Sequence, residues 1–279
     1  MTPTRTEILA GLRAKADEGR AIIGGGAGTG LSAVCAEAAG LDFIVVYNSG
    51  RYRMAGRSSM AGLMPYGDAN AIVMEMAGEI IPVVHRIPVV AGVCGTDPFR
   101  SMPVFLDEIR RIGFAGVQNY PTVCLFDGII RANLEETGLG FDREVEMIAE
   151  AHARDLVTIT YVHHEDEAAA MARAGADVVV AHMGLTTSGR IGAQTAVSLD
   201  DAVERVGALQ DAARAVRSDV LTVCHGGPIA GPDDAAYVLE RVPGLGGFLG
   251  ASSMERIPTE IAMTAHMRRF TELTTGAGA

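Results

Sequence analysis

Short apolar runs alternate with amphipathic stretches along nearly the whole chain. The amphipathic stretches have the 3.6-residue spacing of helices, and one of them, at 6–18, precedes the first apolar run. Apolar runs without polar alternation are typical of parallel strands that are covered on both faces. The pattern predicts strands at 21–23, 43–46, 88–93, 115–118, 157–162, 178–181, 221–224 and 247–250. It predicts the following helices at 31–39, 71–85, 101–112, 143–154, 165–174, 199–217, 233–241 and 258–270.

Eight strand–helix units in one chain are the pattern of a closed α/β barrel, which typically needs about 250 residues. The chain has 279 residues, of which 48% are hydrophobic, enough for one large core. We therefore predict a single (β/α)8 TIM barrel over 1–279, with a leading N-terminal helix and a frayed tail at 274–279. An open, doubly wound parallel sheet is the alternative that the same alternation allows.

Polar residues stand where several of these strands end. His182 follows the run at 178–181, His225 follows the run at 221–224, and Asp97 comes shortly after the run at 88–93. The carboxyl ends of parallel barrel strands meet at one face, and that face carries the active site. We expect one mouth of the barrel to be surrounded by Asp97, Asn119, His182, His225 and Glu255.

The histidines bring candidate chemistry to this mouth. His182 and His225 have ordinary pKa values near neutrality and are candidates for general acid and base. They are also candidate metal ligands, with Glu255 or Asp97 supplying oxygen, and histidine ligation would favour Zn²⁺. The alternative is that backbone carbonyls satisfy both rings. The catalytic candidates, and equally the candidate metal ligands, are Asp97, His182, His225 and Glu255.

A second group of residues is expected to hold the substrate. The loop after the strand at 43–46 contains Asn48, Ser49, Gly50 and Arg51, and it offers hydroxyl, amide and guanidinium donors to a carboxylate or phosphate. Alternatively, the arginines of this loop pair with acidic residues on the surface or on a neighbouring subunit. Further candidates for substrate contact at the same strand ends are Thr96, Asn119, Thr186, Thr187, Ser188, Gly226, Gly227, Ser252 and Ser253.

Two segments do not fit the regular barrel pattern. The connection at 120–142 is too long for an ordinary barrel loop, has an apolar middle, and is expected to be a lid over the mouth. A static arm packed on a neighbouring subunit is the alternative. The connection at 54–66 and the last helix carry apolar residues outside the barrel pattern. We therefore expect a homo-oligomer.

Composition removes several function classes. The net charge is −11 and no basic run exists, so neither nucleic acid nor an anionic membrane is an expected partner, whereas a small anionic substrate is. No apolar stretch is long enough for a membrane span, and the four cysteines have no metal-type spacing. We expect reduced cysteines and a cytoplasmic protein. The only lysine is Lys15, in the first helix, which argues against a Schiff-base or pyridoxal phosphate (PLP) enzyme. The glycine run at 24–30 lacks the Gly-x-Gly-x-x-Gly spacing, so NAD is not expected.

Seven longer stretches together resemble one known family. They are 47–57, 63–70, 91–99, 116–122, 133–138, 176–189 and 250–256, and the resemblance extends over roughly residues 5–270. The chain resembles the phosphoenolpyruvate hydrolase-like TIM-barrel family. A similar domain forms the C-terminal part of a class of plant virus-resistance proteins. The family is placed near the phosphoenolpyruvate mutase and isocitrate lyase superfamily.

The resemblance implies a hydrolase or lyase. Members of that superfamily cleave or form C–C, P–C or P–O bonds next to an α-oxo acid or its enolate, with Mg²⁺ and a gating loop after the fourth strand. By this resemblance, Asn48, Ser49 and Gly50 would seat a substrate carboxylate, and 120–142 would be the gating loop. The superfamily's aspartate cluster is represented only by Asp97, and its lysine-containing gating motif is absent.

Two functions from different classes follow. The first is an enzyme that acts on a small oxo-carboxylate or an enol-type anion, by hydrolysis or by retro-aldol or retro-Claisen cleavage. The second is a non-catalytic barrel that binds a ligand or a protein. The number of polar strand ends favours the enzyme, because a scaffold does not need them at one mouth.

Overall fold

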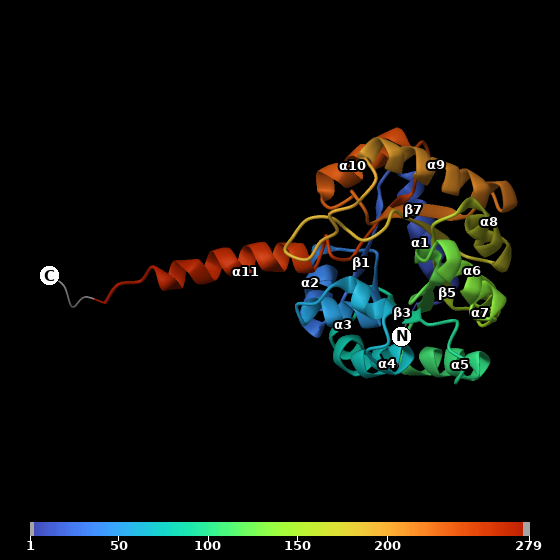
Figure 1. Ribbon diagram of the computed structural model, residues 1–279, viewed down its shortest axis with the longest axis horizontal. Coiled ribbons are helices and arrows are strands. Elements are labelled where there is room, and N and C mark those ends of the chain that lie inside the picture. The colour runs from blue at the N-terminus through green and yellow to red at the C-terminus, as the bar shows by residue number, and fades with distance from the viewer. Residues whose placement is uncertain (1–2, 276–279) are drawn as a thin grey trace.

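Eight parallel strands close into a barrel in the computed structural model, which describes residues 3–275. The strands are neighbours in chain order, and β8 pairs with β1 to complete the cylinder (Figure 1). This arrangement confirms the predicted (β/α)8 TIM barrel. The strands are β1 (Ile22–Gly26), β2 (Phe43–Val46), β3 (Val89–Val93), β4 (Gly116–Asn119), β5 (Val157–Val162), β6 (Val178–His182), β7 (Leu221–His225) and β8 (Gly247–Gly250).

Helices surround this cylinder. Helix α1 (Arg5–Asp17) precedes the first strand and begins with a capping box between Thr4 and Glu7. The helices that follow the strands are α2 (Gly30–Ala39), α3 (Asn48–Met54), α4 (Ala69–Ile80), α5 (Met102–Ile112), α6 (Gly128–Glu136), α7 (Phe141–Ala153), α8 (Glu165–Ala174), α9 (Leu199–Val216), α10 (Pro232–Arg241) and α11 (Arg256–Thr271). Short 3-10 helices are η1 (Ser59–Leu63), η2 (Ile81–Val83) and η3 (Val123–Leu125).

The first three glycines of the run at 24–30 extend the strand that was predicted at 21–23. Gly24, Gly25 and Gly26 all belong to β1. A Cβ atom on Gly24 would lie 2.3 Å from Cζ of Phe43, so glycine is needed here for the Phe43 ring to pack against the strand. Gly24 therefore makes room for an aromatic side chain within the strand.

The polar segment after β2 is helical, although the sequence analysis treated it as a loop. Helix α3 covers Asn48–Met54. Residues four apart share one face of a helix, so Ser49 and Arg53 both face inward and are buried. Arg51 points away from them and pairs with Glu75, with Nη1 2.6 Å from the carboxylate oxygen. This helix decides which arginine of the segment reaches the interior.

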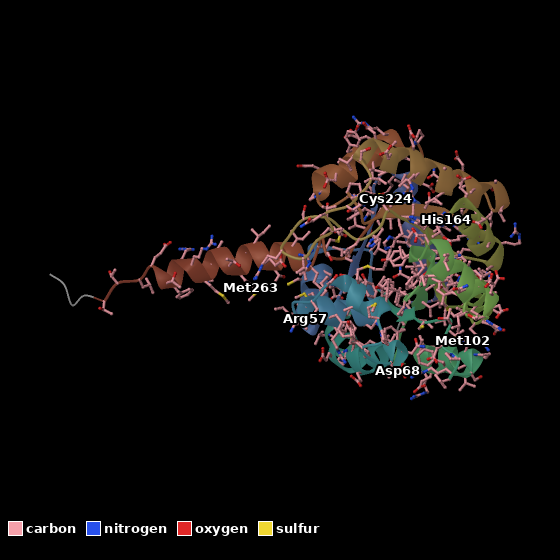
Figure 2. All side chains as sticks on the ribbon, viewed as in Figure 1. Arg57, Asp68, Met102, His164, Cys224 and Met263 are labelled. Atoms are coloured by element: carbon pink, nitrogen blue, oxygen red, sulfur yellow. The ribbon has the colours of Figure 1, made fainter. Side chains whose placement is uncertain are left out.

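Helix α11 departs from the predicted barrel in another way. The helix predicted at 258–270 is present, but it extends away from the other elements instead of packing on the barrel (Figure 1). Beyond the first turn of the helix, Figure 2 shows its side chains, Met263 among them, projecting away from the barrel. The frayed tail was predicted at 274–279, and residues 276–279 lie outside the described residues.

The strands carry the core. Nearly every strand residue is buried, which agrees with apolar runs covered on both faces. Four free cysteines are present, of which Cys124 and Cys224 are buried. Within residues 3–275, no helix combines the length and apolar character needed to cross a membrane.

Candidate functional site

Two cavities open among the segments that follow the carboxyl ends of the strands. The smaller one, which we call the histidine cavity, has a volume of about 40 Å³. The larger one, which we call the Asp97 pocket, has a volume of about 650 Å³ and a mostly apolar wall. The histidine cavity is lined by Tyr47, Ser49, Arg53, Ser59, Met60, Tyr120, Leu125, Tyr161, His182, Gly184, Leu185, Thr186, His225, Ala251 and Ser252.

His182 and His225 end two neighbouring strands and lie side by side. They are register partners between β6 and β7, and their ring centroids are 4.5 Å apart. Tyr161, at the end of β5, lies against both rings, at 4.7 Å from His182 and 4.9 Å from His225. The structure thus brings together the two histidines that the strand-end pattern singled out.

The hydrogen bonds of the two rings assign opposite roles to their Nε2 atoms. Nδ1 of His225 lies 2.6 Å from the carbonyl oxygen of Leu249, which can only accept, so Nδ1 carries the proton and Nε2 is an acceptor. Nδ1 of His182 accepts from the backbone N–H of Gly184 at 3.0 Å, so the proton of the neutral ring is on Nε2. His225 offers an unprotonated nitrogen, which can accept a hydrogen bond, and His182 offers an N–H donor.

Both rings are held neutral. Burial lowers the pKa of His182 well below its ordinary value, and the nearby His225 and His163 rings lower it further. Burial also lowers the pKa of His225 to about 4, against the opposing effect of the Leu249 carbonyl. At neutral pH the pair therefore carries no charge, which preserves one donor and one acceptor.

Tyr161 completes this group. Its hydroxyl lies 3.4 Å from Nε2 of His225 and donates to it, because burial raises the pKa of Tyr161 well above the ordinary value and keeps the hydroxyl protonated. Sequence analysis missed Tyr161. A tyrosine one residue before the end of the predicted strand at 157–162 was the signal that could have found it.

Glu255 is a partner of Arg53. One carboxylate oxygen accepts from Nε and Nη2 of Arg53 at 2.7 and 2.5 Å, and the other accepts from the backbone N–H of Gly28 and the hydroxyl of Ser32. Both side chains are almost completely buried. Burial alone would lower the pKa of Arg53, but the charges and hydrogen bonds of Glu255 and Tyr47 together outweigh burial and raise it, so the guanidinium stays charged. Glu255 therefore fixes an arginine that lines the histidine cavity.

Asp97 lies apart from the histidines, on the wall of the larger pocket. Its carboxylate accepts from Asn70 and from the backbone N–H of Phe99 at 2.9 Å each, and it pairs with Arg100. Burial alone would raise the pKa of Asp97, but these donors outweigh it and hold the pKa below the ordinary value. Thr96 and Asn48 line the same pocket.

Asn119 is committed to the sheet. Its amide oxygen accepts from the backbone N–H of Tyr161 at 2.7 Å, and its amide nitrogen donates to Glu144 at 2.6 Å. It therefore joins the ends of β4 and β5 to α7 and lines neither cavity. Asn48 is similarly occupied, since its side chain bonds to the backbone of Gly62 and Ser49.

The remaining predicted contact residues divide between the cavity and its supporting loops. Ser49, Thr186 and Ser252 line the histidine cavity. Gly226 and Gly227 follow β7 with φ of +72° and +57°, a conformation that favours glycine, and the N–H of Gly227 donates to the carbonyl of Gly184. Outside the cavity wall lie Gly50, Arg51, Thr187, Ser188 and Ser253.

The donor set does not fit a divalent metal. No group of three or more His, Cys, Asp or Glu side chains in the described part of the chain could hold a metal ion. Both oxygens of Glu255 are occupied by donors, Asp97 lies in the other pocket, and the Arg53 guanidinium would repel a cation at the two histidines. The metal implied by the family resemblance therefore has no ligand set among Asp97, His182, His225 and Glu255.

Two tomato proteins (Solanum lycopersicum) are similar to almost the whole chain. They are the ToMV resistance protein Tm-1(GCR237) and the ToMV susceptible protein tm-1(GCR26), each 59% identical over 266 residues. The match covers 95% of this chain but 35% of each tomato protein. The chain therefore spans about a third of the length of these relatives.

Solved structures share the fold. A phosphonopyruvate hydrolase in complex with oxalate and Mg²⁺ is 20% identical, with a TM-score of 0.59, over 96% of this chain and 88% of that one. A 2,3-dimethylmalate lyase, described as a member of the PEP mutase/isocitrate lyase superfamily, is 18% identical with the same TM-score, over 95% and 87%. The model of one family, described as phosphoenolpyruvate hydrolase-like, matches residues 7–273 and so includes the whole barrel and both cavities. The chain therefore belongs to the phosphoenolpyruvate hydrolase-like family.

Proposed function

We propose that the protein is an enzyme, a hydrolase or lyase, that cleaves a small oxo-carboxylate or an enol-type anion at the histidine cavity. The observation that carries the proposal is the His182–His225 pair. Two neutral rings, 4.5 Å apart, bring an N–H donor and an unprotonated acceptor nitrogen to the same cavity. Hydrolysis and C–C cleavage both need a base and a donor placed in this way.

His225 is the proposed base. Its Nε2 would take a proton from water in a hydrolysis, or from a substrate hydroxyl in a retro-aldol cleavage. A pKa of about 4 makes the free ring a weak base, but the negative charge of a bound substrate favours the protonated ring and would raise that pKa. Tyr161, which donates to Nε2, would yield this position to the substrate or relay the proton to Nε2. After the bond breaks, the protonated His225 would return this proton to the carbon of the enolate.

His182 is the proposed donor. Negative charge builds up on an oxygen of the substrate when water attacks or when the C–C bond breaks to leave an enolate. The N–H of His182 would donate to that oxygen, in a buried site where such a bond is stronger than in water. The depressed pKa of His182 keeps the ring neutral, so its N–H donates a hydrogen bond and no proton is transferred from it.

The experiment is a thermal-shift screen of small oxo- and hydroxy-carboxylates and of phosphoenolpyruvate, followed by turnover measurements by NMR on each stabilising compound. We expect His225→Asn and His182→Asn to lower kcat by about 100-fold or more, the usual contribution of a positioned acid or base. His85→Asn, at an exposed histidine far from the cavity, is the matched control and should turn over at the wild-type rate. Wild-type turnover by both cavity variants would contradict the proposal.

Binding without catalysis is the second candidate function. It is favoured by the tomato relatives, which are named for resistance or susceptibility to ToMV. Both forms match this chain at the same 59% identity, so identity to this chain does not separate them. A compound that stabilises the fold but stays intact after long incubation with the protein would favour this function over the enzyme.

A further inference from the structure

We infer that Arg53 recognises a carboxylate group inside the histidine cavity through its remaining donor, Nη1, and that Glu255 is the positioning residue that aims it. This inference rests on the proposed function, because it names the group of the substrate that the same cavity takes. It replaces Arg51, which pairs with Glu75 outside the cavity.

The first observation is an unused donor in a buried place. The Arg53 side chain is 1% exposed, and Nε and Nη2 both donate to Glu255. Nη1 has no hydrogen-bond partner anywhere in residues 3–275. Leaving a buried charged donor without an acceptor is unfavourable, because its lost hydration is not replaced. A ligand that accepts from Nη1 would recover this free energy, and the residue already lines the cavity.

The second observation is the sign of the surroundings. The cavity wall, which lies wholly within the described residues, contains no Asp or Glu. The polar residues Ser49, Ser252, Tyr161 and His182 also line it. Glu255 is the counter-ion of Arg53, but all its acceptor positions are directed away to Gly28, Ser32 and the other guanidinium nitrogens. The cavity therefore suits an anion and not a cation.

The third observation is size. A volume of about 40 Å³ corresponds to about three water-sized positions. A carboxylate group has three heavy atoms, whereas a phosphoryl group has more and a tetrahedral shape. The cavity thus fits the carboxylate end of a substrate, and the rest of the molecule would extend past Met60, which lines the cavity and is 41% exposed.

The absence of tryptophan from the sequence allows a direct binding test. Met60→Trp places a single fluorescent reporter at the rim of the cavity, and Val104→Trp places one on the exposed face of α5. We would titrate both variants with acetate, glyoxylate and inorganic phosphate at constant ionic strength. In the Met60→Trp variant we expect a saturable fluorescence change with the two carboxylates and a much weaker response to phosphate. In the Val104→Trp variant we expect no saturable change. A reporter at position 60 that responds to none of the carboxylates would overturn the inference.

Removing Arg53 alone would leave Glu255 buried without its partner and endanger folding. The test variant is therefore Arg53→Gln/Glu255→Gln in the Met60→Trp background, since a glutamine at 255 can still accept from the N–H of Gly28. Arg51→Gln/Glu75→Gln removes a matched pair that starts from the same helix but lies outside the cavity. In the Arg53→Gln/Glu255→Gln variant we expect carboxylate affinity to fall about tenfold or more, because one charge-assisted hydrogen bond is lost. In the Arg51→Gln/Glu75→Gln variant we expect it to be unchanged.

The two proposals can fail separately. Equal carboxylate affinity in the folded Arg53→Gln/Glu255→Gln variant and in its parent would overturn the role of Arg53, even if turnover still depends on His225. Conversely, carboxylate binding that depends on Arg53, together with no turnover of any compound, would leave this subsite standing and remove the proposed enzyme. If the double variant does not fold, a crystal structure of the wild-type protein with acetate decides, by whether acetate accepts from Nη1.

Discussion

At the scale of single residues, burial has opposite consequences for the two ionisable pairs of the site. It holds His182 and His225 neutral, because neither ring has a carboxylate beside it. It leaves Arg53 charged, because Glu255 is in direct contact. The chemistry that we propose needs both outcomes, a neutral donor–acceptor pair and one fixed positive charge.

The lowered pKa of His225 predicts a loss of stability in mild acid. Between the ordinary value of 6.5 and about 4, the unfolded chain binds a proton at this residue and the native protein does not, so the free energy of unfolding decreases as pH falls through this window. Above pH 6.5 neither the native nor the unfolded protein is protonated at His225, so this residue no longer lowers the free energy of unfolding. The loss at this residue amounts to about 3 kcal/mol at the lower end.

Urea denaturation of the wild type and His225→Asn from pH 7.5 to pH 4.5 measures this effect. Asparagine retains a donor near the position of Nδ1 for the carbonyl of Leu249, so the variant removes the titration with little change in shape. We expect the wild-type curve to fall more steeply below pH 6.5 than the variant curve. His85→Asn, at an exposed position in the segment before β3, should keep the wild-type slope. Parallel curves for the wild type and His225→Asn would show that His225 is not held neutral.

At the scale of elements, the barrel could be predicted because its strands are buried on both faces and so appear as uninterrupted apolar runs. The two strand-end histidines followed from the same pattern, since the carboxyl end of a strand fixes where the next residue lies. Arg53 could not be chosen over Arg51, because the choice depends on α3 being helical. The segment of α3 is short and polar and has no apolar periodicity to reveal a helix.

The partners of Glu255 could not be predicted from the sequence, for a different reason. A glutamate after the last strand has the same appearance in a sequence whether it faces substrate or an arginine. Its partners come from the loop after β1 and from α3, which are about 200 residues away in sequence. Such long-range pairs leave no local signal in the sequence. The buried side-chain amide of Gln118 on β4, which has no hydrogen-bond partner among the described residues, could not be predicted from the sequence either.

The connection at 120–142 remains our predicted lid. Its contacts show which part of it is held firmly and which part is held loosely. Its root is fixed, because Glu144 of α7 accepts from the backbone N–H of Val123, from Thr122 and from Asn119 at 2.6–2.7 Å. Helix α6 beyond it has no buried residue and is joined to α8 by Arg131, 2.8 Å from Glu167. Leu125 lines the histidine cavity, and Phe126 and Ile130 line the Asp97 pocket. The segment therefore contributes to the walls of both cavities.

Hydrogen exchange tests this lid. With a saturating carboxylate from the thermal-shift screen, we expect the amides of 125–140 to become more protected, because closure over a ligand would order α6. The root at 119–123 and the barrel strands should change little, since they are already hydrogen bonded and buried. Equal protection of 125–140 with and without ligand would make the segment a static arm, the alternative that the sequence left open.

At the scale of the whole molecule, helix α11 is the feature that the isolated chain does not explain. An isolated helix of 16 residues is marginal in water, because most helical stability in proteins comes from packing. Met263, Met267 and Phe270 recur at the spacing of one helix face and are 51–62% exposed. On the barrel, Met64 and Tyr66 in the connection after α3 are also exposed, at 51% and 64%. Together they form apolar surface that a second copy of the chain would cover.

The position of α11 relative to the site makes its packing matter for function. Glu255, which aims Arg53, is the residue directly before the helix begins at Arg256. Arg256 is itself buried and donates to the backbone of Ser188 and to Glu260. The first turn is thus tied to the barrel, while the remainder projects from it. A partner that holds α11 would therefore also steady the residue that positions Arg53.

We accordingly expect a homo-oligomer, and light scattering at micromolar concentration should give a mass that is a multiple of 29.2 kDa. Met263→Glu/Met267→Glu places two charges on the apolar face and should shift the mass to 29.2 kDa, while circular dichroism shows the barrel retained. Thr264→Glu/Arg268→Glu has the same spacing but lies off that face, and it should leave the oligomer intact. A wild-type monomer would refute the assembly. An oligomer that survives the methionine substitutions would show that copies meet through another surface, and α11 would then need a partner other than a second copy of this chain.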